Sequence, residues 1–129
     1  KGEMWRDFTY IDDLIQSITK LMEIIPTKSD YLKIKESGLS PVAPYRIINI
    51  GNQKSIKIDD FINTLEKVIG KKAIRNNLPI QKGDVDFTLS NCDLLYKLTG
   101  FVPSTPLEKG IKLFYNWYKD YYNLDKKTF

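Results

Sequence analysis

The chain has 129 residues, enough for one domain, and its 42% apolar and 28% charged residues are ordinary for a soluble globular protein. No apolar run approaches the ~20 residues that a membrane span needs. The absence of histidine excludes Ser/His/Asp and Cys/His catalysis and every His-based metal site. The single cysteine, Cys92, excludes an internal disulfide and predicts a reducing, cytoplasmic compartment.

The net charge of +4 allows a polyanionic partner in principle. The lysines are spread along the chain, however, and the only adjacent pairs are Lys71-Lys72 and Lys126-Lys127. Nucleic-acid binding usually needs a concentrated basic patch, so no nucleic-acid partner is expected. A solvated, lysine-rich surface is the simpler interpretation, and weak polyanion binding remains an alternative function.

The first predicted elements are a strand and a helix. Aromatic residues favour a short strand over 5–10, and apolar residues at helical spacing predict an amphipathic helix over 11–25. The polar stretch 27–44 predicts a long exposed loop. A second strand is predicted over 45–50, where the β-rich run YRIINI is followed by the turn signal Gly51-Asn52.

The middle of the chain is predicted to hold a helix over 58–69, which Gly70 ends, and a short strand over 73–78. Ser90 followed by Asp93 forms a capping box for a short helix that ends at Gly100.

The last helix has the clearest start signal, because Thr105 can cap it and Pro106 suits its first position. Glu108 stands where it can reach back to the cap. The residues expected on its buried side recur at helical spacing: Leu107, Ile111, Phe114, Tyr118 and Tyr121.

The predicted order is strand, helix, strand, helix, strand, helix, helix, which favours an α/β fold. We expect a small parallel or mixed sheet with flanking helices. The strands are too few for a complete doubly wound sheet. The sheet is therefore expected to be incomplete, and the chain to be the second part of something larger.

Three stretches, GEMWRDFTYIDDLI, APYRIINIGN and LPIQKGDVDFT, resemble the extended short-chain dehydrogenase/reductase family of Rossmann-type enzymes. Within it they are most similar to the nucleotide-sugar epimerases, in particular the UDP-glucuronate 4-epimerases. The resemblance implies that residues 1–122 are the C-terminal, sugar-nucleotide-binding region of an NAD-dependent epimerase. It leaves residues 123–129 as a tail and implies that the N-terminal NAD-binding domain is absent.

The resemblance implies NAD as the cofactor of the whole enzyme and no cofactor for this chain alone. The family's Gly-rich turn needs closely spaced glycines, and the glycines here are never closer than ten positions apart. The family's catalytic Tyr-x-x-x-Lys pattern occurs at Tyr31/Lys35, Tyr115/Lys119 and Tyr122/Lys126. None of these lies upstream of RDFTYIDD, where the family pair lies, so no catalytic residue is assigned.

Arg6 matches the family arginine that contacts the sugar-nucleotide diphosphate. A guanidinium suits this role because its fork binds phosphate oxygens bidentately. The alternative is a surface arginine paired with Asp7, Asp12 or Asp13.

The stretch Gln81 to Asp84 matches a segment that closes over the nucleotide in the family. Asp84 would accept hydrogen bonds from ribose hydroxyls. Many relatives carry arginine where Gln81 stands, and since glutamine supplies no charge, Lys82 would supply it instead. The alternative is an ordinary turn. Phe8 either lines the nucleotide pocket or packs in the core.

The predicted function is therefore that of a substrate-binding fragment of a UDP-glucuronate-type epimerase, which grips the UDP moiety and is inactive alone. Its expected partners are the missing NAD-binding domain and a UDP-sugar, with no membrane. Self-association is expected through uncovered apolar surface, such as the helical stripe from Leu14 to Ile25. A non-catalytic binding module that keeps the fold is the second alternative.

Overall fold

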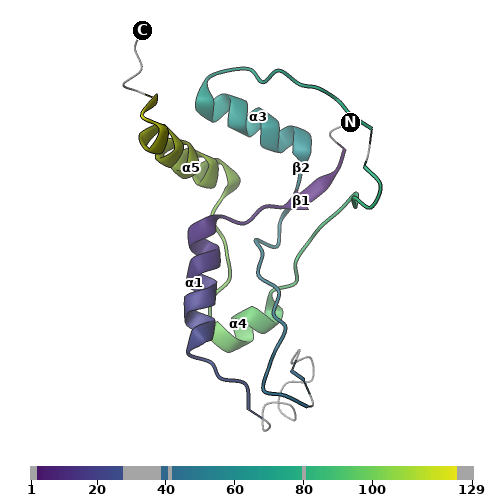
Figure 1. The fold of residues 1–129 in the computed structure, drawn as a ribbon, viewed down its shortest axis with the longest axis vertical. Helices are drawn as coiled ribbons and strands as arrows, with labels where there is room; N and C mark the ends of the chain where they lie inside the picture. The colour runs from purple at the N-terminus through teal and green to yellow at the C-terminus, as the bar shows by residue number, and fades with distance from the viewer. Residues whose placement is uncertain (1–2, 28–38, 41, 80, 125–129) are drawn as a thin grey trace. The chain divides into compact units, whose positions relative to one another are not determined.

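A computed structural model describes residues 3–27, 39–40, 42–79 and 81–124. The chain divides into two compact units. The first comprises Lys1–Arg6, Ser55–Thr88 and Thr105–Phe129, and the second comprises Asp7–Lys54 and Leu89–Ser104. The described residues contain two short strands and four helices (Figure 1), which confirms the predicted α/β class with an incomplete sheet.

The sheet is built around β1 (Trp5–Asp7), which pairs with β2 (Ser55–Lys57). Trp5 also forms a single parallel bridge to Phe87 and exchanges two backbone hydrogen bonds, of 2.8 and 3.1 Å, with the stretch 86–88. β1 therefore lies between β2 and the stretch 86–88. Since β1 carries Arg6, this pairing sets where the arginine stands relative to residues 81–84.

Two helices complete the first unit. α3 (Ile58–Ile69) follows β2 without a loop and packs against α5 (Leu107–Tyr122), as Figure 1 shows. α3 ends as predicted at Gly70, which has the left-handed φ of 75° that favours glycine. The prediction of both helices is confirmed, and α3 has the predicted bounds. The predicted start of α5 is wrong by one residue: Pro106 is the N-cap instead of Thr105, without a side-chain cap hydrogen bond, and the helix begins at Leu107.

The second unit is formed by α1 (Ile11–Met22) and α4 (Asp93–Thr99), which pack against each other. Leu95 and Cys92 are fully buried. α1 is three residues shorter than predicted. The N-cap of α4 is Cys92, without a side-chain cap hydrogen bond, so the predicted capping box of Ser90 and Asp93 does not form. The Asn91 Oδ1 atom, one residue before the N-cap, accepts the Asp93 N–H at 2.9 Å.

Two predicted strands do not form in the described residues. The stretch 45–50 has only an isolated antiparallel bridge between Leu39 and Arg46, although its side chains alternate between exposed and half-buried from Tyr45 to Ile50. This period of two is typical of a strand, but a strand also needs a second strand to complete its hydrogen bonds. The stretch 73–78 is likewise irregular. Most of the predicted loop over 27–44 lies outside the described residues.

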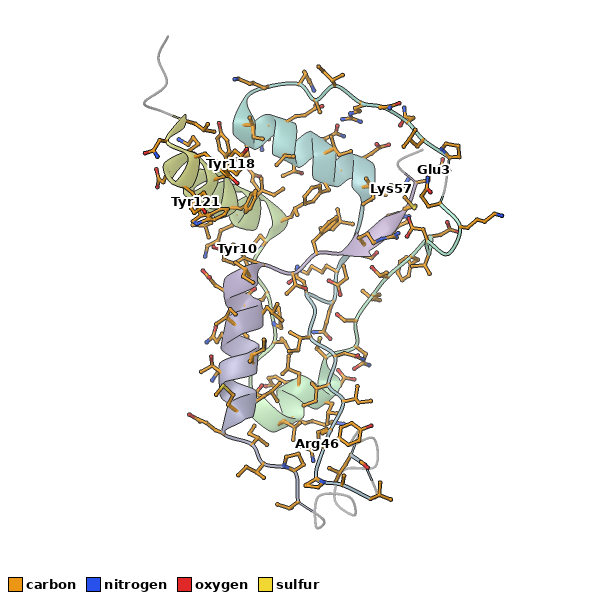
Figure 2. The ribbon with its side chains drawn as sticks, viewed as in Figure 1. Glu3, Tyr10, Arg46, Lys57, Tyr118 and Tyr121 are labelled. Atoms are coloured by element: carbon orange, nitrogen blue, oxygen red, sulfur yellow. The ribbon has the colours of Figure 1, made fainter. Side chains whose placement is uncertain are left out.

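The expected buried side of α5 is largely wrong. Ile111 is buried, but the rings of Phe114, Tyr118 and Tyr121 are 39–65% exposed; Figure 2 labels the two tyrosines on α5. The rings contact other aromatic rings of α5 instead, with 6.2 Å between the centroids of Phe114 and Tyr118 and 5.3 Å between those of Trp117 and Tyr121. The buried hydrophobic residues of the described part are few: Cys92, Leu95 and Ile111.

Candidate functional site

The first unit brings together two of the predicted site residues. The Arg6 Nη2 atom lies 2.6 Å from the Asp84 Oδ1 atom, although the two residues are 78 positions apart in the chain. Their side chains are 21% and 38% exposed, so the ion pair borders on solvent. Arg6 is therefore paired with a carboxylate, but with the other predicted ligand-binding residue rather than with an aspartate of its own segment.

The Arg6 guanidinium is oriented by β1 as well. Its Nη1 atom donates to the Trp5 carbonyl at 2.9 Å, and its Nη2 atom also lies 3.7 Å from the Met4 sulfur. These contacts use three of the five N–H donors of a guanidinium. The other two donors have no hydrogen-bond partner among the described groups.

Residues Gln81 to Asp84 form a turn. The Asp84 N–H donates to the Gln81 carbonyl at 3.1 Å, and Gly83 has a φ of 88°, as the third position of a type II turn requires. The side chains of Gln81 and Lys82 are exposed. The predicted turn is thus present, and the same turn holds Asp84 beside Arg6, so the two interpretations of this stretch are compatible.

Phe8 belongs to the second unit and is half-buried. It is therefore not among the side chains that the first unit brings to Arg6.

Asp7 has a role that the sequence did not reveal. Its carboxylate accepts hydrogen bonds from the backbone N–H groups of Asn52, Gln53 and Ser90, at 3.0, 3.1 and 2.9 Å, and from the Ser90 hydroxyl. We call these residues the Asp7 cluster. A side chain at Gly51 would lie 2.6 Å from the Ser90 Cβ and 2.9 Å from the Asp7 Oδ2, so this approach requires glycine. The cluster thus links three separate segments of the second unit to one another, those around Asp7, Asn52 and Ser90.

Cys92 is packed against the same cluster. Its sulfur lies 3.3 Å from the Gly51 carbonyl oxygen, and its N–H donates to the Gln53 side chain at 3.3 Å. The thiol is fully buried, which makes it a structural group.

The candidate tyrosine–lysine pairs carry no catalytic geometry in the described residues. The Lys119 Nζ lies over the Tyr115 ring, 5.5 Å from its centroid, in a cation–π contact rather than at the hydroxyl. Lys126 and the pair Tyr31/Lys35 lie outside the described residues. Partial burial and the neighbouring Asp12 carboxylate raise the pKa of Tyr10, whereas a catalytic tyrosine needs a lowered one.

A metal site and a membrane-spanning helix are both absent from the part of the chain that the structure describes. No group of three or more Cys, Asp or Glu side chains there could hold a metal ion. None of the described helices has the length and apolar character needed to cross a membrane.

No family model matches the chain, but several proteins are similar to it. A probable UDP-glucuronate 4-epimerase of Rhizobium meliloti (strain 1021) is 42% identical over 124 residues, which cover 95% of this chain and 36% of that protein. Protein CapI of Staphylococcus aureus is 37% identical over 123 residues, covering 94% of this chain and 36% of CapI. The chain thus spans little more than a third of the length of these relatives.

Solved structures agree. The crystal structure of UDP-glucuronic acid 4-epimerase from Bacillus cereus, in complex with UDP-glucuronic acid and NAD, matches 95% of this chain and 34% of its own, with a TM-score of 0.72 and 30% identity. MoeE5 in complex with UDP-glucuronic acid and NAD has the same fold, with a TM-score of 0.75 at 17% identity.

Together these matches show that the chain matches part of the Rossmann-type epimerase fold of the short-chain dehydrogenases/reductases. The resemblance predicted from the sequence is confirmed: relatives and structural neighbours that match nearly the whole chain include UDP-glucuronate 4-epimerases.

Proposed function

We propose that the chain is the C-terminal, sugar-nucleotide-binding part of an NAD-dependent 4-epimerase that acts on UDP-glucuronate or a similar UDP-sugar. The observation that carries this proposal is the direct contact between Arg6 and Asp84, two residues far apart in sequence that match family positions for the same ligand. The Bacillus cereus relative, which was solved with UDP-glucuronic acid and NAD, supports the choice of substrate class.

Each side chain has a defined task in this proposal. Arg6 uses its free N–H donors to bind diphosphate oxygens through charge-assisted hydrogen bonds. Asp84 accepts hydrogen bonds from ribose hydroxyls. Lys82, exposed on the turn, adds the positive charge that Gln81 does not supply. When bound, NAD supplies the hydride acceptor and donor for the sugar C4 atom, and this chain holds the nucleotide end of the substrate.

The second part of the proposal is that an NAD-binding domain covers the exposed face of α1. Four apolar residues on this helix are 43–77% exposed: Ile11, Ile15, Ile18 and Met22. They are spaced three or four positions apart and form one stripe, although α1 also packs on α4. A soluble protein rarely leaves such a stripe uncovered. Without that domain, the stripe favours self-association of the chain.

The chain alone is expected to be inactive and to bind a UDP-sugar only weakly. A single arginine–phosphate contact contributes roughly 1.5–3 kcal/mol, less than the several kcal/mol lost when a ligand is immobilised. The pure 129-residue protein should therefore not interconvert UDP-glucuronate and UDP-galacturonate, even with excess NAD. Turnover by that protein would contradict the proposal that the chemistry lies in another domain.

The role of Arg6 is tested in a protein where the chain is joined to an NAD-binding domain. Arg6→Ala should weaken UDP-glucuronate binding about tenfold or more, because a charge-assisted bond is lost. NAD affinity should hardly change. Both affinities are measured by calorimetric titration of the two proteins. An equal loss for both ligands would show that Arg6 supports the fold rather than the nucleotide.

A further inference from the structure

The ion pair at the proposed site has an unusual consequence for anion binding. Arg6 and Asp84 are in direct contact at 2.6 Å, so any anion that reaches the guanidinium also meets a carboxylate. Because the pair borders on solvent, the attraction to one group and the repulsion from the other act at similar distances and largely cancel. Arg6 as it stands is a poor site for a simple anion.

The two oxygens of Asp84 are used differently. Oδ1 accepts from Arg6 and, at 3.0 Å, from the Val85 N–H. Oδ2 accepts no hydrogen bond from any described group, and the side chain is 38% exposed. A ligand hydroxyl can therefore bind at Oδ2 while Oδ1 continues to hold Arg6.

From this geometry we propose that Asp84 is a specificity-determining residue that screens Arg6 from simple anions. This inference rests on the proposed function. A phosphate or pyrophosphate at Arg6 meets the carboxylate as a repulsive charge. A ribose diphosphate brings hydroxyl donors that turn the same carboxylate into a hydrogen-bond acceptor. Asp84 thus lets Arg6 bind a diphosphate when a ribose accompanies it.

The ion pair is not needed to hold the segment in place. The turn at 81–84 is closed by its own backbone hydrogen bond, and the stretch 86–88 is bonded to Trp5. A partly exposed ion pair adds little to stability. Asp84→Asn, which keeps the shape of the side chain and removes its charge, should leave the fold intact.

The test compares Asp84→Asn with a matched control, Asp86→Asn. Both variants remove one negative charge from the same segment, but no described group contacts the exposed Asp86 carboxylate. Inorganic pyrophosphate is titrated into the full 129-residue chain and followed by NMR chemical shifts, which report dissociation constants up to about tens of millimolar. Unchanged spectra away from the site confirm that each variant is folded.

We expect Asp84→Asn to bind pyrophosphate about fivefold more tightly than Asp86→Asn, as the loss of one charge roughly 5 Å away predicts in a partly exposed site. The gain should vanish in Arg6→Ala/Asp84→Asn. Equal affinities of the two single variants, or no pyrophosphate binding by Asp84→Asn, would overturn the inference.

A second arm uses UDP. Asp84→Asn should lower the ratio of UDP affinity to pyrophosphate affinity, because the ribose hydroxyls lose a charged acceptor. If both ligands bind more tightly by the same factor, the ribose part of the inference is wrong. A different result would contradict the proposed function itself: wild-type protein joined to an NAD-binding domain would bind UDP-glucuronate no better than pyrophosphate.

Discussion

Replacing Asp7 with alanine should destabilise the protein more than any other single truncation of a partly exposed aspartate. Its carboxylate is the common acceptor for three backbone N–H groups and one hydroxyl, drawn from two segments distant in sequence. Alanine removes all four hydrogen bonds and offers no replacement acceptor.

The expected loss follows from where the donors lie. The N–H groups of Asn52 and Ser90 are partly buried, whereas that of Gln53 is exposed and can bind water instead. A hydrogen bond to a charged group contributes roughly 1.5–3 kcal/mol, so two such bonds give a loss of about 3–6 kcal/mol in the free energy of unfolding. This is a large share of the roughly 5–15 kcal/mol of a typical domain. Asp7→Asn keeps one acceptor oxygen and should lose less.

Urea unfolding followed by circular dichroism measures the change, with Asp120→Ala as the control. Asp120 is exposed on α5, and no described group contacts its carboxylate, so the control should stay within about 0.5 kcal/mol of wild type. Should Asp7→Ala and Asp120→Ala unfold at the same urea concentration, the Asp7 cluster would not hold the second unit together.

Three further predictions test other parts of the structure. Gly51→Ala should lower the melting temperature, because its Cβ would overlap Ser90 in the Asp7 cluster; a scanning calorimeter measures the shift, and an unchanged melting temperature would refute the close approach. Hydrogen bonds from Lys72, Ala73 and Arg75 lower the pKa of Glu66 to about 2, so its contribution to stability should be complete above pH 4.5 and lost as the pH falls toward 2. Glu66→Gln should lack this part of the acid dependence. Stability is measured against pH for wild type and Glu66→Gln, and coinciding curves would contradict the lowered pKa of Glu66. In sedimentation experiments, Ile15→Lys should shift the chain toward monomer. The control Gln16→Lys, which adds the same charge beside the exposed stripe of α1, should not. A wild-type chain that is monomeric at high concentration would contradict self-association.

The helices could be predicted from the sequence because their signals are local. Each amphipathic stripe repeats within its own segment, and Gly70 and Gly100 mark helix ends by adopting left-handed φ values of 75° and 64°. The strands could not be predicted as well. β2 has only three residues, and whether it or the more apolar stretch 45–50 enters the sheet depends on which segment lies beside β1.

The site was predictable in part, and only through the resemblance. Arg6 and Asp84 were both selected from family motifs, yet nothing local to either residue predicts that they contact each other. The Asp7 cluster was missed for a related reason. Its acceptor is a side chain and its donors are backbone N–H groups, which every sequence position except proline provides. Only the tertiary structure shows which of them converge.

Two segments carry sequence patterns that the described structure accommodates only in part. Among the described residues, the stretch 45–50 has the alternation of a strand but forms only an isolated bridge, and α1 packs on α4 but also has exposed apolar residues. A helix that is apolar on more than one side is normally buried, and an extended stretch of this composition normally pairs. Alternate residues of 45–50 and the stripe on α1 are nevertheless exposed. The relatives are nearly three times as long as this chain. The exposed stripe of α1 is therefore what the proposed covering by an NAD-binding domain would require.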